Sequence, residues 1–147
     1  MGRALRVVTG MDQMGERSIW IDCDVIQADG GTRTASTTGA FIALADAFTT
    51  LKTKGLIKKR PLTDYLAAVS VGKVGGEILV DLAYVEDSVA EVDMNLVMTS
   101  KGQFVEIQGT AERTPFAKQD MDGFLAQGWS AIQTLTNLQR DLVGALD

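Results

Sequence analysis

A glycine pair followed by a threonine and an arginine is the most informative feature of the sequence. Gly30 and Gly31, the Gly-Gly turn, end an alternating apolar run, and a segment of helical character starts at Thr32. The first N–H groups of a helix lack intrahelical partners and carry partial positive charge, so phosphate is a natural ligand there. Thr32 or Thr34 could cap the helix, and Arg33 could bind the same anion through two hydrogen bonds. An ordinary strand-to-helix turn with a threonine cap has the same local pattern and is the commoner structure.

A second group of residues with chemical potential is acidic. Five carboxylates fall within the thirteen residues 81–93, here called the acidic segment: Asp81, Glu86, Asp87, Glu91 and Asp93. Clustered carboxylates repel one another, so they occur where solvent screens them or where a cation joins them. Composition alone favours a solvated loop, because runs of charge are usually solvated.

The Gly-Gly turn is expected to lie between a strand and a helix. Residues 18–26 alternate as a strand does, and four side chains are expected on its core face: Ile19, Ile21, Cys23 and Val25. Residues 32 to about 51 are predicted to form a helix, with one face of small residues: Ala35, Gly39, Ala43 and Ala47. Such a face would let the helix lie close to a sheet and would place the turn near the end of that sheet.

Two hairpins and a long helix complete the predicted fold. The hairpins pair residues 66–72 with 77–82, and residues 94–98 with 104–108. From Lys118 onward, apolar residues recur at helical spacing: Met121, Leu125, Ile132, Leu135, Leu138 and Leu142. This order predicts a single α+β domain over residues 1–147, with two layers and a mixed sheet.

Two polar residues lie in the last predicted strand. Glu106 and Gln108 alternate with Val105 and Ile107, which are expected to face the core. The two polar side chains could therefore point toward the same site as the turn. Polar residues on an exposed strand face need no special role, however, so the pattern leaves both interpretations open.

Composition limits the class of protein. The chain has 147 residues, 46% hydrophobic and 22% charged, as is ordinary for one globular domain. No apolar leader and no run near twenty apolar residues is present, so we expect a cytoplasmic protein. The absence of histidine excludes histidine-based acid–base catalysis and histidine-ligated zinc. The single cysteine, Cys23, is more typical of a small buried hydrophobe than of a nucleophile.

The net charge of the chain bears on RNA binding. A formal net charge of −5 argues against broad electrostatic attraction to RNA, because phosphate contacts to lysine and arginine dominate that binding. Any RNA site must therefore be local.

Four segments resemble, in the same order, the ribonuclease PH family. They are WIDCDVIQADGGTRTAS at 20–36, PLTDYLAAVSVG at 61–72, EDSVAEVDMN at 86–95 and GQFVEIQGTAE at 102–112. The resemblance extends from about residue 2 to about residue 142. It implies a ribosomal protein S5 domain 2-like fold, the RNase PH fold, and a homo-oligomer built as a ring of dimers.

The resemblance also implies an activity and assigns residues to it. The family uses inorganic phosphate to trim tRNA precursors from the 3′ end, releasing nucleoside diphosphates. Gly31, Thr32 and Arg33 stand where the family holds the attacking phosphate. Asp87 and Asp93 stand where the family has its two active-site aspartates, which support Mg²⁺ binding and proton transfer.

Family members are longer than this chain. The resemblance covers only the part of their sequence that comes after the N-terminal strands, so we expect an N-terminally truncated form of the fold. The main interpretation is a phosphorolytic exoribonuclease that acts on RNA. The alternative is an inactive remnant that retains only phosphate or partner binding.

Overall fold

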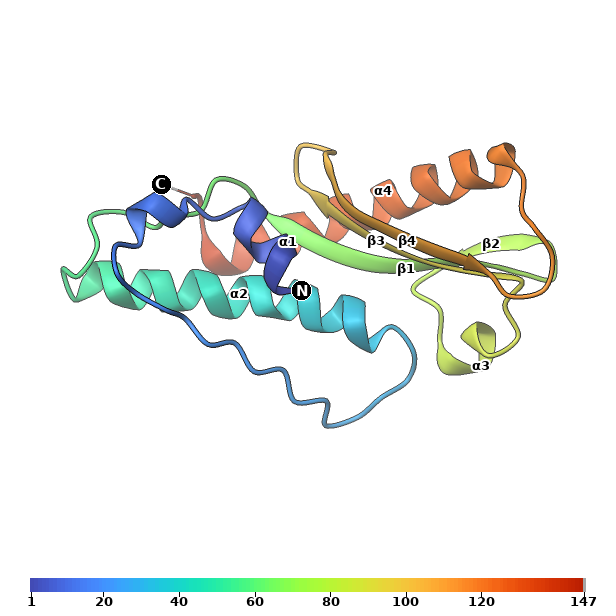
Figure 1. Cartoon of the computed structure of the whole chain (residues 1–147), viewed down its shortest axis with the longest axis horizontal. Helices are drawn as coiled ribbons and strands as arrows, with labels where there is room; N and C mark the ends of the chain where they lie inside the picture. Colours follow the sequence, from blue (N-terminus) through green and yellow to red (C-terminus); the bar gives the residue numbers. More distant parts are fainter. Residues whose placement is uncertain (147) are drawn as a thin grey trace.

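The computed structural model describes residues 1–146 (Figure 1). Its helices are α1 (Gly2–Val7), the 3₁₀ turn η1 (Met11–Gln13), α2 (Thr32–Thr53), α3 (Tyr84–Asp87) and α4 (Lys118–Val143). Its strands are β1 (Leu66–Val74), β2 (Glu77–Val80), β3 (Val92–Thr99) and β4 (Phe104–Ala111). None of the helices within residues 1–146 combines the length and hydrophobicity needed to cross a bilayer.

The four strands form one sheet in the order β2-β1-β3-β4. Both predicted hairpins are confirmed, and the β1–β2 turn contains Gly75 and Gly76, each with a positive φ. Every pairing between neighbouring strands is antiparallel, so the predicted mixed sheet is wrong in its strand directions. The α+β fold class is confirmed.

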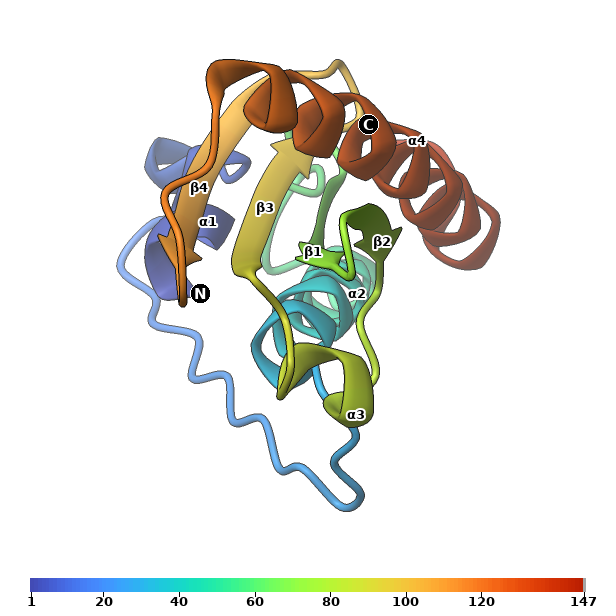
Figure 2. The ribbon, with the colours of Figure 1, turned by 90° about the vertical axis from the view of Figure 1, so that its right-hand side faces the viewer.

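Both faces of the sheet are covered, α2 lying on one face and α4 on the other (Figure 2). Neighbouring residues of the sheet alternate between two apolar clusters: Ala68 and Val97 join the cluster that contains α2 side chains, and Val69 and Leu96 join the one that contains α4 side chains. The molecule therefore has three layers where the sequence predicted two. The central strands are apolar on both faces, so each face needs a helix to cover it.

Helix α2 has the predicted start and nearly the predicted length, but its buried face differs from the predicted one. The small residues Ala35, Gly39 and Ala43 are exposed, whereas the core side carries larger side chains such as Phe41 and Phe48. Burying a phenylalanine removes far more apolar area from water than burying an alanine. The larger residues therefore decide which way the helix faces.

Helix α4 confirms the predicted long helix, again with a shifted face. Ile132 is fully buried as expected, but Leu138 and Leu142 are exposed. Gln139 is buried in their place, and its amide nitrogen donates to the carbonyl oxygens of Leu66 (2.8 Å) and Thr38 (3.2 Å). These bonds tie the end of α4 to both α2 and the start of β1.

The predicted strand at 18–26 is not a strand in the structure. These residues are extended and run apart from the sheet (Figures 1 and 2), and no backbone hydrogen bond joins them to another described segment. The predicted alternation holds in part: Ile19, Ile21 and Cys23 are half-buried, whereas Trp20 is 93% exposed. Val25, expected on the core face, is exposed. A strand needs a neighbour to complete its hydrogen bonds, and within residues 1–146 this segment has none.

The unpaired state of residues 18–26 predicts fast hydrogen exchange. Backbone amides 18–26 should exchange orders of magnitude faster than the β1 amides that are hydrogen-bonded to neighbouring strands, because those amides are released only when the sheet opens. Hydrogen–deuterium exchange with peptide-level mass spectrometry measures both segments in one sample. Comparable protection of the two segments would contradict the unpaired arrangement.

Candidate functional site

The Gly-Gly turn starts helix α2 as predicted. Gly31 is the N-cap residue of α2, and its φ of 58° lies in the left-handed region that glycine tolerates. No side-chain hydrogen bond caps the helix at this position. The hydroxyl of Thr34 instead donates to the Gly31 carbonyl oxygen at 2.7 Å. The predicted threonine cap is therefore wrong, and no side chain caps the first N–H groups of α2. This is the arrangement that an anion-binding helix start requires.

The turn is packed against the entrance to α3 (Figures 1 and 2). A Cβ atom on Gly30 would lie 2.4 Å from the carbonyl oxygen of Leu82 and 3.0 Å from the amide nitrogen of Tyr84. The same Tyr84 N–H donates to the carboxylate of Asp29 at 3.1 Å. The chain therefore brings the Gly-Gly turn and the acidic segment into backbone contact, although some fifty residues separate them in sequence.

Ser70 connects the sheet to both partners of this contact. Its hydroxyl oxygen accepts the Leu82 N–H at 3.1 Å, and it would lie 3.6 Å from a Cβ atom on Gly31. Sequence reasoning missed both Ser70 and Asp29. Asp29 had a usable signal, since an aspartate before a glycine pair is typical of turns, whereas a serine within an apolar strand gave none.

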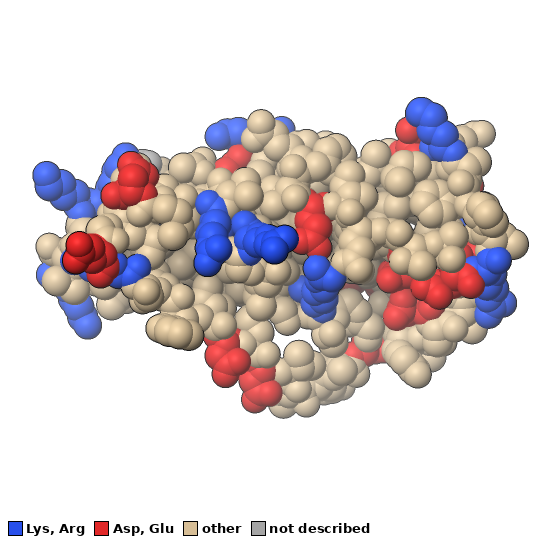
Figure 3. Space-filling model, viewed as in Figure 1, with Lys and Arg blue, Asp and Glu red and all other residues tan. Residues whose placement is uncertain are grey.

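Some of the acidic side chains have structural partners. Glu86 accepts the backbone N–H of Ala83 (2.9 Å), and Glu91 accepts that of Gly76 (3.0 Å). These two carboxylates stabilise the α3 start and the β1–β2 turn. Acidic side chains gather at the end of the molecule that carries α3 (Figure 3).

Asp93 and Asp87 are close enough to interact electrostatically. Burial raises the pKa of the half-buried Asp93 carboxyl above its ordinary value, and the negative charges of Asp87 and Glu112 raise it further. Asp93 lies on β3, paired with Gly72 on one side and Thr110 on the other. The negative charge of Asp93 is therefore less favourable than that of a solvated carboxylate, chiefly because the group is half-buried.

Asp87 and Asp93 offer the oxygen donors that Mg²⁺ prefers, but only two of the ligands that it needs. Within residues 1–146, no group of three or more histidine, cysteine, aspartate or glutamate side chains is arranged to hold a metal. Mg²⁺ commonly uses one or two carboxylates and completes its shell with water and substrate phosphates. Asp87 and Asp93 therefore suit Mg²⁺ in the presence of a phosphate substrate, and they do not form a complete metal cage.

Arg33 extends from the first turn of α2 to strand β4. One terminal nitrogen donates to Glu106 at 2.6 Å, and the other donates to the amide oxygen of Gln108. Glu106 and Gln108 thus contact a residue of the predicted phosphate site, as one of the two sequence interpretations expected. A bulge between Val97 and Met98 shifts the β3–β4 register beside this contact.

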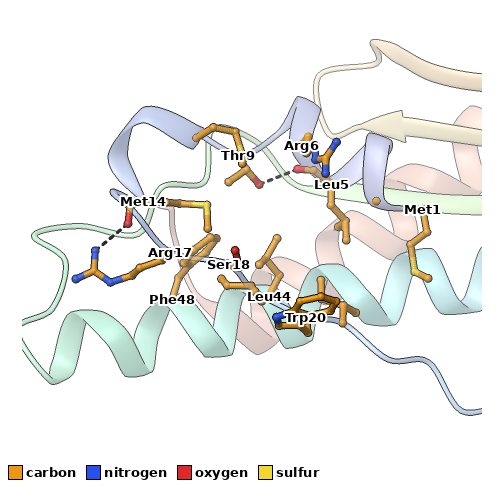
Figure 4. A pocket seen from close by; sticks show the side chains of 14 residues that line it. Met1, Leu5, Arg6, Thr9, Met14, Arg17, Ser18, Trp20, Leu44 and Phe48 are labelled. Carbon is orange, nitrogen blue, oxygen red and sulfur yellow. Dashed lines mark hydrogen bonds between the residues drawn. The ribbon is translucent and has the colours of Figure 1, made fainter.

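An apolar cavity of about 450 Å³ lies elsewhere in the fold (Figure 4). It lies between α1, α2 and the start of the extended segment, and is lined by residues such as Leu5, Met14, Ile19 and Phe48. None of its fourteen lining residues belongs to the Gly-Gly turn or the acidic segment. Arg33 and Glu106 instead line a much smaller hollow, together with Thr34 and Asn95.

Comparison with known proteins identifies related sequences and a related fold. The profile of the 3′ exoribonuclease family, domain 1, matches residues 1–49, and that of the same family, domain 2, matches residues 64–130. Ribonuclease PH from Bacillus velezensis is 57% identical over 145 residues, and ribonuclease PH from Bacillus subtilis is 56% identical over 146. Each alignment covers 98% of this chain and 59% of the relative, so the chain spans about three fifths of the relatives' length.

A solved structure supports the fold at lower sequence identity. Rrp46 from rice (Oryza sativa) superposes with a TM-score of 0.63 at 17% identity, covering 82% of this chain and 52% of the rice chain. This similarity concerns the fold. The sequence matches confirm the resemblance to ribonuclease PH that the four motif segments predicted.

The contact between Gly30 and the α3 entrance predicts a large effect of a single methyl group. Gly30→Ala should lower the melting temperature more than Gly55→Ala does. Both glycines have a positive φ, 72° and 68°, so both variants carry the left-handed strain of about 1–2 kcal/mol. Only at Gly30 does the new Cβ also meet backbone. Thermal unfolding of the two variants measures the difference, and equal losses would show that the close contact is absent.

The raised pKa of Asp93 predicts a pH-dependent gain in stability on neutralising it. Because the native state holds this proton more tightly than the unfolded chain, native stability falls as pH rises from the ordinary value of 3.8 through the raised native pKa. Asp93→Asn, measured with a chelator present, should therefore melt higher than the wild type at neutral pH, by about 2–4 °C for each kcal/mol relieved. The difference should shrink at pH values below 3.8.

Asp122→Asn is the control for this measurement, because Asp122 is exposed and pairs with Lys118 on α4. It should give no gain at neutral pH. A lower melting temperature for Asp93→Asn across the whole pH range would show that the carboxylate is stabilised where it lies.

Proposed function

Since this chain belongs to the 3′ exoribonuclease family, we propose that it carries a phosphorolytic centre of the ribonuclease PH type. In this reaction an oxygen of inorganic phosphate bonds to the last phosphorus of an RNA 3′ end. The bond from that phosphorus to the 3′ oxygen of the preceding nucleotide breaks, and a nucleoside diphosphate leaves. The observation that carries the proposal is the backbone contact between Gly30 and residues 82–84, which sets the Gly-Gly turn beside the acidic segment.

The start of α2 is the proposed phosphate site. The backbone of Gly31 and Thr32 provides N–H groups without side-chain partners, and the Arg33 guanidinium adds a charged donor. Phosphoryl transfer is accelerated chiefly by positioning and by charge stabilisation, so holding the nucleophile in place is a substantial part of the catalysis. The three residues act together because they are consecutive at one helix start.

The acidic pair has the complementary task. Asp87 and Asp93 are the proposed ligands of Mg²⁺, which would stabilise negative charge on the scissile phosphate. A carboxyl group of this pair is also the proposed source of the proton taken up by the departing 3′ oxygen. The electrostatic coupling of the two aspartates supports this assignment, because two carboxylates held near each other favour a cation or a proton.

The proposed substrate is the 3′ end of a tRNA precursor, and the proposed assembly is a homo-oligomer in the cytoplasm. The relatives are ribonucleases, and this chain spans 59% of their length. The net charge of −5 favours recognition of the RNA end by local contacts over attraction along the whole polymer. The end of the RNA is the part that must reach the Gly-Gly turn and the aspartates.

Phosphate-dependent release of nucleoside diphosphates from a short oligoribonucleotide tests the proposal. Asp87→Asn and Asp93→Asn should each lower kcat by about 100-fold or more, the scale of a lost acid–base or metal-binding group. Arg33→Ala should raise the KM for phosphate more than it weakens RNA binding, because the guanidinium holds the nucleophile. Asp122→Asn, which removes the same charge from α4, is the matched control and should behave as the wild type.

The outcomes separate the two functions considered from the sequence. Turnover that depends on both aspartates supports the phosphorolytic centre. A wild-type chain that binds phosphate without turnover would favour the inactive remnant. Full activity in both aspartate variants would mean that the acidic segment is only a solvated loop.

A further inference from the structure

The contact of Arg33 with strand β4 has a geometry that a simple surface ion pair does not need. Glu106 and Gln108 are separated by one residue on β4, and they approach the two terminal nitrogens of the same guanidinium. On the neighbouring strand β3, Glu106 is paired with Val97 and Gln108 with Asn95. A rigid strand that is paired with the sheet thus presents two acceptors to one arginine.

Stability does not explain this arrangement. The side chain of Arg33 is 55% exposed and that of Glu106 is 32% exposed, and ion pairs at such exposure contribute little to folding. An arginine side chain has many rotamers, however, and holding it at both nitrogens fixes the plane and direction of the guanidinium. The effect of the contact is therefore on where Arg33 points.

The clamped guanidinium retains donors for an anion. A guanidinium has five N–H groups, and the contacts to Glu106 and Gln108 use one on each terminal nitrogen. Three N–H groups remain, including the one on Nε. Arg33 directly follows Thr32 at the start of α2, so these donors belong to the same helix end as the free backbone N–H groups.

We propose that Glu106 and Gln108 are positioning residues, which hold Arg33 in the orientation that binds the attacking phosphate. The inference rests on the proposed phosphate site at the start of α2. An alternative is that Glu106 merely occupies the place of the anion. The contact of Gln108 argues against this alternative, because an uncharged amide, which does not mimic an anion, binds the second terminal nitrogen of Arg33. Two acceptors of different charge share the task of fixing the group.

The test measures binding of inorganic phosphate by titration calorimetry, without RNA, on Glu106→Ala, Glu106→Gln and Gln108→Ala. Each alanine variant should weaken phosphate binding about tenfold, as expected for losing one hydrogen bond to a charged group. Glu106→Gln keeps an acceptor oxygen and should stay within about threefold of the wild type. In the phosphorolysis assay the change should fall mainly on the phosphate KM, not on kcat.

Matched controls and a double variant separate positioning from general damage. Glu77→Ala and Gln103→Ala remove the same side-chain types from exposed positions outside β4 and should bind phosphate as the wild type does. In an Arg33→Ala background, Glu106→Ala should have no further effect, because Glu106 acts through Arg33. Circular dichroism confirms that each variant is folded.

Three results would overturn the inference, and one of them would also overturn the proposed phosphate site. Unchanged phosphate affinity in both alanine variants would reduce the contact to a surface ion pair. Tighter phosphate binding by Glu106→Ala would show that Glu106 competes with the anion. A wild-type chain that binds no phosphate would remove the proposed phosphate site itself, and with it the role of the clamp.

Discussion

The close approach of Gly30 to the backbone of residues 82–84 is the constraint on which the rest of the site depends. No side chain fits between these two segments, since even a methyl group on Gly30 would lie 2.4 Å from the Leu82 carbonyl oxygen. The left-handed conformation of Gly31 then directs the chain into α2, which aims Arg33 at β4. On the other side of the contact, α3 leads into the acidic segment and β3, which carry Asp87 and Asp93. Glycine is required here because its backbone can approach another backbone so closely and can adopt a positive φ.

The sequence predicted those parts of the fold that local patterns determine. Alternation and glycine turns located both hairpins, and apolar spacing located α2 and α4, because these signals act within a few residues. The buried face of each helix was predicted less well. Phe41 and Gln139 face the core through competition among many neighbours in three layers, which a one-dimensional pattern does not contain. The wrong prediction of a strand at 18–26 has a similar cause. The alternation of this segment is visible in the sequence, but its pairing depends on a neighbouring strand.

The sequence predicted the individual residues of the candidate site, but it did not predict that they lie close together. The helix start and Arg33 were identified from the glycine pair and its local pattern, and the roles of Asp87 and Asp93 through a family motif. Their proximity comes from the antiparallel order of the sheet and from the contact at Gly30, neither of which local sequence specifies. The absence of a threonine cap was also beyond the sequence, because Gly31 in a left-handed conformation starts the helix without one.

The charges of the site oppose one another in a way that suits the proposed reaction. Phosphate and RNA are both anions, and the chain carries a net charge of −5 with carboxylates gathered beside the helix start. The raised pKa of Asp93 shows that its surroundings already disfavour another negative charge. An anion can therefore be held there only by donors fixed in place, which are the N–H groups of α2 and the guanidinium of Arg33, or by a cation that the carboxylates bind. A freely moving arginine beside Glu106 would lose part of its attraction for phosphate to the carboxylate. Held at both nitrogens by β4, as we propose, it would keep its remaining donors for the anion, and the acidic surroundings would then favour the cation instead of excluding the substrate.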